Sequence, residues 1–241
     1  MSLPPLTLNA WLRYDLVERT LARLPGVSSI LEIGCGEGAL AARLARRFSY
    51  VGVEPDPAAC ARARERVHGT GAEIVLGDVS VLPSGSSFDL VCAFEVLEHL
   101  ADDAAALRSW RERLTPGGWL MLTVPADPAR FGPADRRVGH LHRYEPIGLR
   151  NLLAGSGFAE SDVRRFGFPL GNALELGRNV LARVDRGEGG QMERTAVSGR
   201  WRQPPDQLGW ATQAATAPFR FVQRRFDADR GPGLFALARR P

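Results

Sequence analysis

The sequence of 241 residues predicts an α/β fold in which helices cover both faces of a doubly wound, mostly parallel sheet of seven strands. Short apolar segments alternate with amphipathic segments of helical spacing, as in repeated βαβ units. Residues 88–94 are almost uniformly apolar, which is typical of a parallel strand buried on both faces. A turn with three glycines separates the first predicted strand from a helix, as at the nucleotide-binding end of such a sheet.

The predicted elements follow one another in the order that a doubly wound sheet requires. Strands are predicted over residues 28–33, 50–53, 72–76, 88–94, 119–124, 159–166 and 233–238. Helices are predicted over residues 39–48, 57–67, 102–114 and 146–154. Residues 126–137 contain two prolines and a glycine and are predicted to form a loop. Because this loop follows the carboxyl end of a strand, we expect it on the ligand-binding side of the sheet.

The chain is predicted to be a single domain, since its length and its apolar fraction of 44% suit one full-sized core. Residues 1–27 are predicted to form an N-terminal helical cover, with a helix over residues 7–24, and residues 28–168 the core. Residues 233–239 are predicted to form the closing strand. The sequence therefore has one folding unit with an additional segment before its last strand.

That segment, residues 169–232, is longer than a strand connection needs, and we predict that it forms a helical cap. Helices are predicted over residues 170–184 and 207–226, the second interrupted at Pro218, around a polar stretch over residues 186–205. Apolar faces with arginine rims suit three roles: a lid over the acceptor, a homodimer contact or attachment to a membrane surface.

The glycine turn has the spacing Gly34, Gly36 and Gly38, and the acid Glu32 lies two residues before it. Glycine allows positive φ and lets backbone N–H groups approach a ligand closely. The spacing differs from the Gly-x-Gly-x-x-Gly of dinucleotide-binding proteins, which disfavours an NAD-dependent dehydrogenase. Glu54 ends the second predicted strand, twenty residues after Gly34. A carboxylate at this distance is placed to accept hydrogen bonds from both ribose hydroxyls of an adenosine.

Four sequence blocks in this order resemble the class I S-adenosylmethionine-dependent methyltransferases: residues 31–38 (LEIGCGEG), 52–56 (GVEPD), 77–79 (GDV) and 114–118 (LTPGG). The resemblance covers about residues 28–168 and implies a Rossmann-like methyltransferase fold, with S-adenosylmethionine as cofactor. It places the amino-acid end of the cofactor at residues 34–38, the ribose at Glu54 and the adenine at Asp78 and Val79. The implied cofactor-binding residues are Glu32, Gly34, Cys35, Gly36, Gly38, Glu54, Pro55, Asp78, Val79, Phe94, Glu95 and His99.

The segment Gly139-His140-Leu141-His142-Arg143-Tyr144, directly before a predicted helix, is similar to a small-molecule branch of this family. That branch acts on quinone precursors, sugars, lipids and secondary metabolites, so we predict methyl transfer to an oxygen, nitrogen or carbon of a small molecule. His140, His142 and Tyr144 are the predicted catalytic residues. His140 suits a general base because imidazole titrates near neutral pH, although a hydrogen bond that fixes the loop is an equal alternative.

Two other functions remain open at this point. One is a non-catalytic S-adenosylmethionine-binding subunit that needs a partner chain. The other is an RNA-directed or metal-dependent methyltransferase. Glu95, Glu98 and His99 would share a face of a helical turn and could hold a divalent cation with His140 or His142. The same pentapeptide also resembles metal-free small-molecule enzymes, and we predict no metal.

Composition narrows the partners and the location. All 31 basic residues are arginine, so lysine chemistry is excluded, and a net charge of +4 without a basic run disfavours nucleic acid. No segment approaches the roughly eighteen apolar residues of a membrane span, and residues 1–5 are no signal peptide, which predicts a cytoplasmic location. Cys35, Cys60 and Cys92 lack metal-ligand spacing and are expected to be reduced thiols.

Overall fold

A computed structural model describes residues 3–184, 209–225 and 230–241 of the chain. Within these residues seven strands form one sheet in the order β3-β2-β1-β4-β5-β7-β6. The last strand in sequence, β7, runs antiparallel to both of its neighbours, and the other strand pairs are parallel. The strands are β1 (Ser29–Ile33), β2 (Ser49–Glu54), β3 (Glu73–Leu76), β4 (Phe88–Phe94), β5 (Leu114–Pro125), β6 (Ala159–Phe166) and β7 (Gly233–Arg239). The predicted doubly wound, mostly parallel sheet is confirmed.

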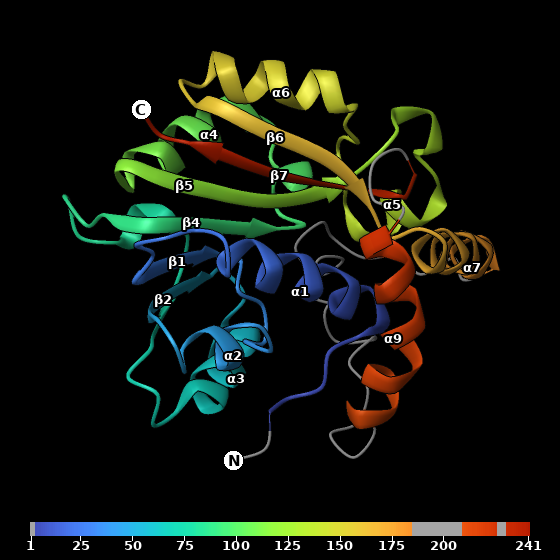
Figure 1. Cartoon of the computed structure of the whole chain (residues 1–241), viewed down its shortest axis with the longest axis horizontal. Helices are drawn as coiled ribbons and strands as arrows, with labels where there is room; N and C mark the ends of the chain where they lie inside the picture. Colours follow the sequence, from blue (N-terminus) through green and yellow to red (C-terminus); the bar gives the residue numbers. More distant parts are fainter. Residues whose placement is uncertain (1–2, 185–208, 226–229) are drawn as a thin grey trace.

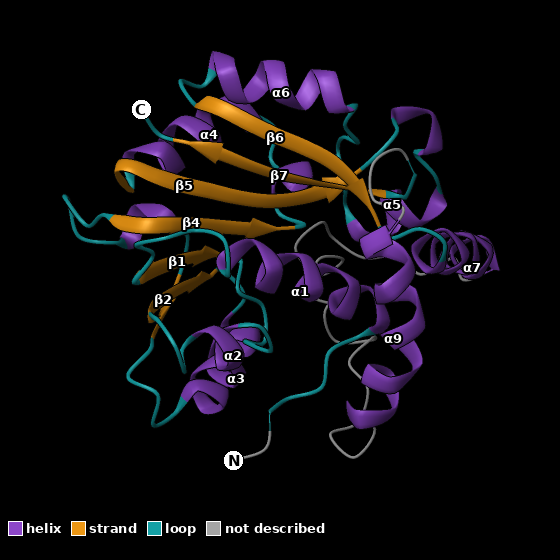
Figure 2. Ribbon diagram, viewed as in Figure 1, coloured by secondary structure: helices purple, strands orange, loops and turns teal. Residues whose placement is uncertain are grey.

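Helices cover both faces of this sheet (Figure 2). They are α1 (Leu8–Leu21), α2 (Ala41–Leu44), α3 (Pro57–Val67), α4 (Asp103–Glu112), α5 (Pro133–Val138), α6 (Pro146–Gly155), α7 (Leu170–Val184) and α9 (Gly209–Arg225). Side chains of α4 and α6 pack on one face of the sheet, and those of α1, α2 and α3 pack on the other. Strand β1 contributes Leu31 to the first core and Ile30 to the second, because successive side chains of a strand point to opposite faces.

Local sequence explains where several elements begin. The Asp56 carboxylate accepts a hydrogen bond from the backbone N–H of Ala59 at 2.7 Å and caps α3, with Pro57 in the first turn. Thr7 caps α1 in the same way, through Ala10. Strand β5 begins at Leu114, five residues before its predicted start, and α2 covers only Ala41–Leu44 of the predicted residues 39–48.

The prediction of a loop over residues 126–137 is wrong, because this segment contains α5 and a 3-10 turn at Pro128–Arg130. Helix α5 begins after Gly132 with Pro133 in its first turn, and it ends at Gly139 with φ 78°. Proline near the start and a left-handed glycine at the end are helix-boundary signals, which the segment's polarity obscured. The Asp135 carboxylate accepts the backbone N–H of Gly132 at 2.8 Å, so it also closes the helix start.

Helix α9 continues through Pro218, so the predicted interruption there is wrong. Contacts with α1 hold both halves of the helix in line. The Trp11 indole N–H donates to Thr212 at 3.2 Å before the proline, and the Gln223 amide donates to the Leu12 carbonyl at 3.0 Å after it. These tertiary contacts offset the backbone hydrogen bond that proline removes. The predicted polar stretch over residues 186–205 lies outside the described residues.

Helices α5, α7 and α9 lie at the end of the sheet toward which β4 and β5 point, on the right in Figure 1. This is the carboxyl end of the parallel strands, where ligands bind in open α/β sheets. The described helices include none that is both long and apolar enough to cross a membrane.

Candidate active site

The glycine turn after β1 has the backbone conformation that its sequence predicts. Gly34, Gly36 and Gly38 have φ values of 69°, 56° and 75°. A Cβ atom at Gly34 would lie 2.7 Å from a Val96 methyl group, and one at Gly38 would lie 2.8 Å from the Cα of Ala63. A Cβ at Gly36 would meet no described atom within 4 Å. Two glycines therefore serve close packing, and the third faces open space where a ligand can approach the backbone.

Glu54 ends β2 beside this turn and is oriented by two backbone groups. Its Oε2 accepts the N–H of Gly36 at 2.8 Å, and its Oε1 accepts the N–H of Asp56 at 3.0 Å. Burial raises the pKa of this carboxyl, and the two hydrogen bonds oppose that effect. Each carboxylate oxygen keeps acceptor capacity for a further donor. The arrangement fits the pair of ribose hydroxyls of an adenosine.

The strand ends next to Glu54 hold the other predicted cofactor residues, in different environments. Asp78 and Pro55 are exposed, and the Asp78 carboxylate accepts the N–H of Ser80 at 2.8 Å at the start of a short 3-10 turn (Val79–Val81). Hydrogen bonds from Ser80 lower the pKa of Asp78. The Val79 side chain belongs to the core, which leaves its backbone for any ligand contact. The Cys35 thiol is buried, and burial raises its pKa.

Glu32 is buried in β1, where the Tyr50 hydroxyl donates a hydrogen bond to its carboxyl group. Burial raises the pKa of Glu32 to about 7, against an opposing effect of the Tyr50 bond. The folded state therefore holds the Glu32 proton more tightly than the unfolded state, whose carboxyl has an ordinary pKa of 4.5. The resulting stabilisation is present below about pH 4.5 and is lost as the pH rises through 7.

We expect the free energy of unfolding of the cofactor-free protein to fall between pH 5 and pH 8, with a contribution of roughly 2.5 kcal/mol from Glu32. Glu32→Gln should flatten this dependence because glutamine does not titrate. Urea unfolding at each pH measures the effect. Glu73→Gln, at an exposed position of β3, is the matched control. An equally steep slope in Glu32→Gln would place the titrating group elsewhere.

Glu95 follows β4 directly and has a φ of 58°, in the left-handed region that non-glycine residues rarely adopt. Its carboxylate accepts the Thr123 hydroxyl at 2.9 Å and lies 3.9 Å from the Arg13 guanidinium. That guanidinium also lies 5.8 Å from the centre of the Phe94 ring. Strained backbone of this kind is concentrated at functional sites, and Glu95 lies between the cofactor-side strand ends and a cavity.

The cavity has a volume of about 370 Å³ and lies over the carboxyl ends of β4 and β5. Helix α1 and the cap helix α7 supply parts of its wall, and so do Glu95, His99 and the α5 segment. Its charged lining residues are Arg13, Glu95, Asp135, Arg143, Glu175 and Arg178, and its imidazoles are His99 and His140. The described residues therefore form a pocket of mixed charge at the carboxyl ends of β4 and β5.

His140 is the predicted catalytic residue that lines this pocket. Its Nδ1–H donates to the Asp135 carboxylate at 2.8 Å, which leaves Nε2 with the lone pair. Although burial alone would raise the pKa of Asp135, hydrogen bonds from His140 and Arg143 hold it well below its usual range. An ionised Asp135 thus fixes the imidazole tautomer and would stabilise a proton taken up at Nε2.

His142 and Tyr144 are not among the residues that line the pocket. The Nε2–H of His142 donates to the Leu100 carbonyl at 3.2 Å. The Tyr144 hydroxyl is buried and donates to the Asp103 carboxylate at 3.1 Å. Burial, followed by the charge of Asp103, raises the pKa of Tyr144 far above its usual range. The structure therefore separates these two residues from His140.

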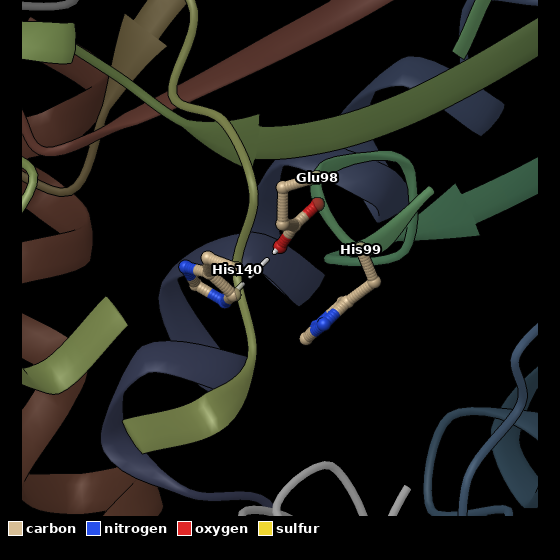
Figure 3. A group of neighbouring side chains, drawn as sticks. All are labelled: Glu98, His99 and His140. Atoms are coloured by element: carbon tan, nitrogen blue, oxygen red, sulfur yellow. Dashed lines mark ion pairs between the residues drawn. The ribbon is translucent and has the colours of Figure 1, made fainter. Parts of the chain in front are cut away.

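Figure 3 shows the three residues that a metal ion would use, Glu98, His99 and His140. One ligand atom from each lies within 4.8 Å of the others. Glu98 is fully buried, and neither of its carboxyl oxygens has a hydrogen-bond partner among the described residues. Its Oε1 lies 3.6 Å from His140 Nε2, which is longer than a hydrogen bond. Burial raises the pKa of Glu98 well above its usual range and lowers that of His99 to about 4.

We expect activity to survive exhaustive EDTA treatment and to gain nothing from added magnesium, manganese or zinc. The physical reason is that burial favours a neutral carboxylic acid at Glu98 and a neutral His99, so the cluster needs no cation to balance its charge. Methyl transfer by protein dialysed against EDTA, compared with untreated protein, measures the outcome. Loss of activity that a single cation restores would assign Glu98, His99 and His140 to a metal site.

Residues outside the predicted set complete the pocket. Asp135, Glu175 and Arg178 were not predicted, nor was Arg13. Asp135 lies five residues before His140 in a segment whose helix-start signals were visible in the sequence. Glu175 and Arg178 are three residues apart on one face of a helix, but nothing in that pattern distinguishes a pocket wall from a solvated face.

Comparison with known proteins agrees with this geometry. Residues 9–160 match the family model of a methyltransferase domain. A "Probable S-adenosylmethionine-dependent methyltransferase" of Mycobacterium tuberculosis is 32% identical over 248 aligned residues, which cover 97% of this chain and 85% of the relative. The "Ubiquinone biosynthesis O-methyltransferase" of Xanthomonas axonopodis pv. citri is 32% identical over 142 residues, which cover 56% of this chain and 59% of that protein.

A solved S-adenosylmethionine-dependent methyltransferase from Mesorhizobium loti has the same fold, with a TM-score of 0.60 and 20% identity over 94% of this chain and 98% of that one. The fold and the glycine-turn site define a class I methyltransferase. The chain belongs to the methyltransferase domain family. It is an S-adenosylmethionine-dependent enzyme, and the open space at Gly36 beside Glu54 fits this cofactor.

Proposed function

We propose that the enzyme methylates an oxygen, nitrogen or carbon of a small molecule held in the 370 Å³ pocket. The observation that carries this proposal is an oriented base, the Asp135–His140 pair, in the wall of a pocket that Glu95 also lines. The volume lies in the range of about 300 to 1,000 Å³ that is typical of small-molecule sites. The relative whose name gives ubiquinone biosynthesis supports a hydroxyl acceptor.

Bound S-adenosylmethionine supplies a methyl group that its sulfonium already activates. The chain therefore has to align the acceptor atom with that methyl group, exclude water and remove a proton where the acceptor keeps one. His140 Nε2 takes that proton, and Asp135 holds the imidazole in place and stabilises its charged form. Glu54 holds the ribose, Asp78 and Val79 the adenine, and residues 34–38 the amino-acid end.

Turnover of methyl-labelled S-adenosylmethionine against a panel of phenols, amines, sugars and peptides tests this function. We expect label to appear in at least one small molecule, with S-adenosylhomocysteine as the other product. Cofactor binding without transfer to any acceptor would favour a non-catalytic subunit that needs a partner chain. Transfer to RNA instead of a small molecule would contradict the acceptor class.

We propose that α7 acts as a wall of the acceptor pocket. Its inner face supplies Glu175 and Arg178 to the cavity, which supports a cap over the acceptor. Its outer face exposes Leu176, Val180 and Leu181, which would suit the two other predicted roles, a homodimer contact or a membrane surface. Light scattering and vesicle sedimentation separate these two roles.

We also propose a cytoplasmic location, which the buried free cysteines Cys35, Cys60 and Cys92 support.

A further inference from the structure

A guanidinium that has no partner among the residues the structure describes lines the proposed acceptor pocket. Arg178 is half-buried on α7 and contributes to the cavity wall. It makes no hydrogen bond or ion pair with any residue that the structure describes, and its Nε is buried without a partner. Burying a cation is costly unless an anion or hydrogen-bond acceptors compensate. Burial accordingly lowers the pKa of Arg178, against the attraction of nearby carboxylates.

Other cations already neutralise the carboxylates of the pocket. Arg143 donates to both oxygens of Asp135, at 3.0 and 2.8 Å, and to Glu175 at 2.5 Å. Arg130 binds the second oxygen of Glu175. Among the residues that the structure describes, these contacts leave Arg178 as the unpaired charge on the inner face of α7.

The third carboxylate of the pocket, that of Glu95, also has partners. It accepts the Thr123 hydroxyl and pairs with Arg13 across the pocket from the cap. With Arg130 counted, four arginines (Arg13, Arg130, Arg143 and Arg178) face three carboxylates (Glu95, Asp135 and Glu175) among the described residues. A single negative charge brought in by a ligand would therefore complete the charge balance at Arg178.

We propose that Arg178 binds a carboxylate of the acceptor, so that the enzyme methylates a small organic acid at a separate nucleophilic atom. This inference rests on the proposed small-molecule function. A guanidinium presents two parallel N–H donors that match the two oxygens of a carboxylate. The position of Arg178 on the cap would hold the acid group away from the strand ends, and the nucleophile would then face His140 and Glu95.

The same surroundings favour a carboxylate over a phosphate. Three acidic side chains line the pocket, Glu95, Asp135 and Glu175. A phosphate monoester carries up to two charges at neutral pH, whereas the ion pairs of these side chains with other arginines leave one described guanidinium, that of Arg178, to balance it. One unpaired arginine matches one negative charge.

Calorimetry with the 241-residue chain saturated with S-adenosylhomocysteine tests this inference. The probes are pairs of small aromatic molecules that differ only in a carboxylate or a primary amide, such as hydroxybenzoates and the matching hydroxybenzamides. We expect the wild type to bind the carboxylate of at least one pair about tenfold or more tightly than its amide. Arg178→Met should reduce that preference to within about twofold, whereas Arg183→Met, at an exposed position of the same helix, should keep it.

The inference is overturned if the wild type discriminates within no pair, if Arg178→Met keeps the preference, or if Arg183→Met loses it equally. Cofactor affinity and methyl transfer are measured on the same samples. Arg178-dependent carboxylate binding without transfer to any small molecule would contradict the proposed function and leave the carboxylate site standing. Transfer to small molecules without a carboxylate preference would support the proposed function and contradict the carboxylate site at Arg178.

Discussion

Replacing His140 with alanine is expected to lower kcat by about a hundredfold or more, because a positioned general base contributes roughly 10²- to 10⁴-fold. The Nδ1 atom of His140 is held by Asp135 at 2.8 Å, so Nε2, which lies 3.6 Å from Glu98 Oε1, keeps the lone pair that would take the acceptor's proton. The affinity for S-adenosylmethionine should change little, because His140 lines a cavity whose lining includes neither the glycine turn nor Glu54. Single-turnover kinetics with the preferred acceptor measure the chemical step separately from product release.

Two companion variants separate a base from a residue that only fixes its loop. Asp135→Asn should lower kcat and alter its pH profile, because an amide no longer selects the Nδ1–H tautomer. His142→Ala should cost less than about threefold if His140 is the base, since His142 is hydrogen-bonded to the Leu100 carbonyl outside the pocket. A drop under threefold in His140→Ala itself would make His140 a structural residue.

Replacing Glu54 with alanine is expected to weaken S-adenosylmethionine binding by roughly 1.5 to 3 kcal/mol, or about 10- to 150-fold in Kd. The variant would lose the proposed charge-assisted bonds to the ribose hydroxyls. It would also lose the bonds that tie the carboxylate to the backbone of Gly36 and Asp56. Calorimetric titration of the cofactor measures the change in affinity.

The matched control is Glu73→Ala, at an exposed position one strand away, which should leave cofactor affinity unchanged. Thermal unfolding shows whether Glu54→Ala remains folded. Because Glu54→Gln keeps one acceptor oxygen, it should fall between the wild type and the alanine variant. A folded Glu54→Ala protein with wild-type affinity would remove Glu54 from the ribose site.

Local sequence carried most of the information about the fold. Glycine spacing, an acid at the end of a strand and alternating apolar segments act over a few residues, so they predicted the sheet and the glycine turn. These local signals were less informative for α5, where the polarity of the segment suggested a loop and its proline and glycine positions indicated a helix. At Pro218 the local rule was wrong because contacts of α9 with α1 stabilise the helix on both sides of the proline.

For the candidate catalytic residues, too, local sequence supplied the candidates and the tertiary contacts distinguished them. His140, His142 and Tyr144 are neighbours in sequence, and their side-chain chemistry does not distinguish them. Backbone geometry after Gly139 directs His140 toward Asp135, whereas His142 and Tyr144 bind groups near the segment that follows β4. Of these three residues, His140 alone lines the pocket.

By itself the sequence determined a class I methyltransferase sheet with its glycine turn and Glu54, because strand, turn and helix signals are local and recur in a fixed order. The tertiary structure decided which polar residues share a pocket. Asp135, Glu175 and Arg178 come from two helices about forty residues apart, and Arg143 joins the first two in one ion-pair network. Such long-range charge pairing depends on how the cap packs over the strand ends, and sequence spacing carries no record of that packing.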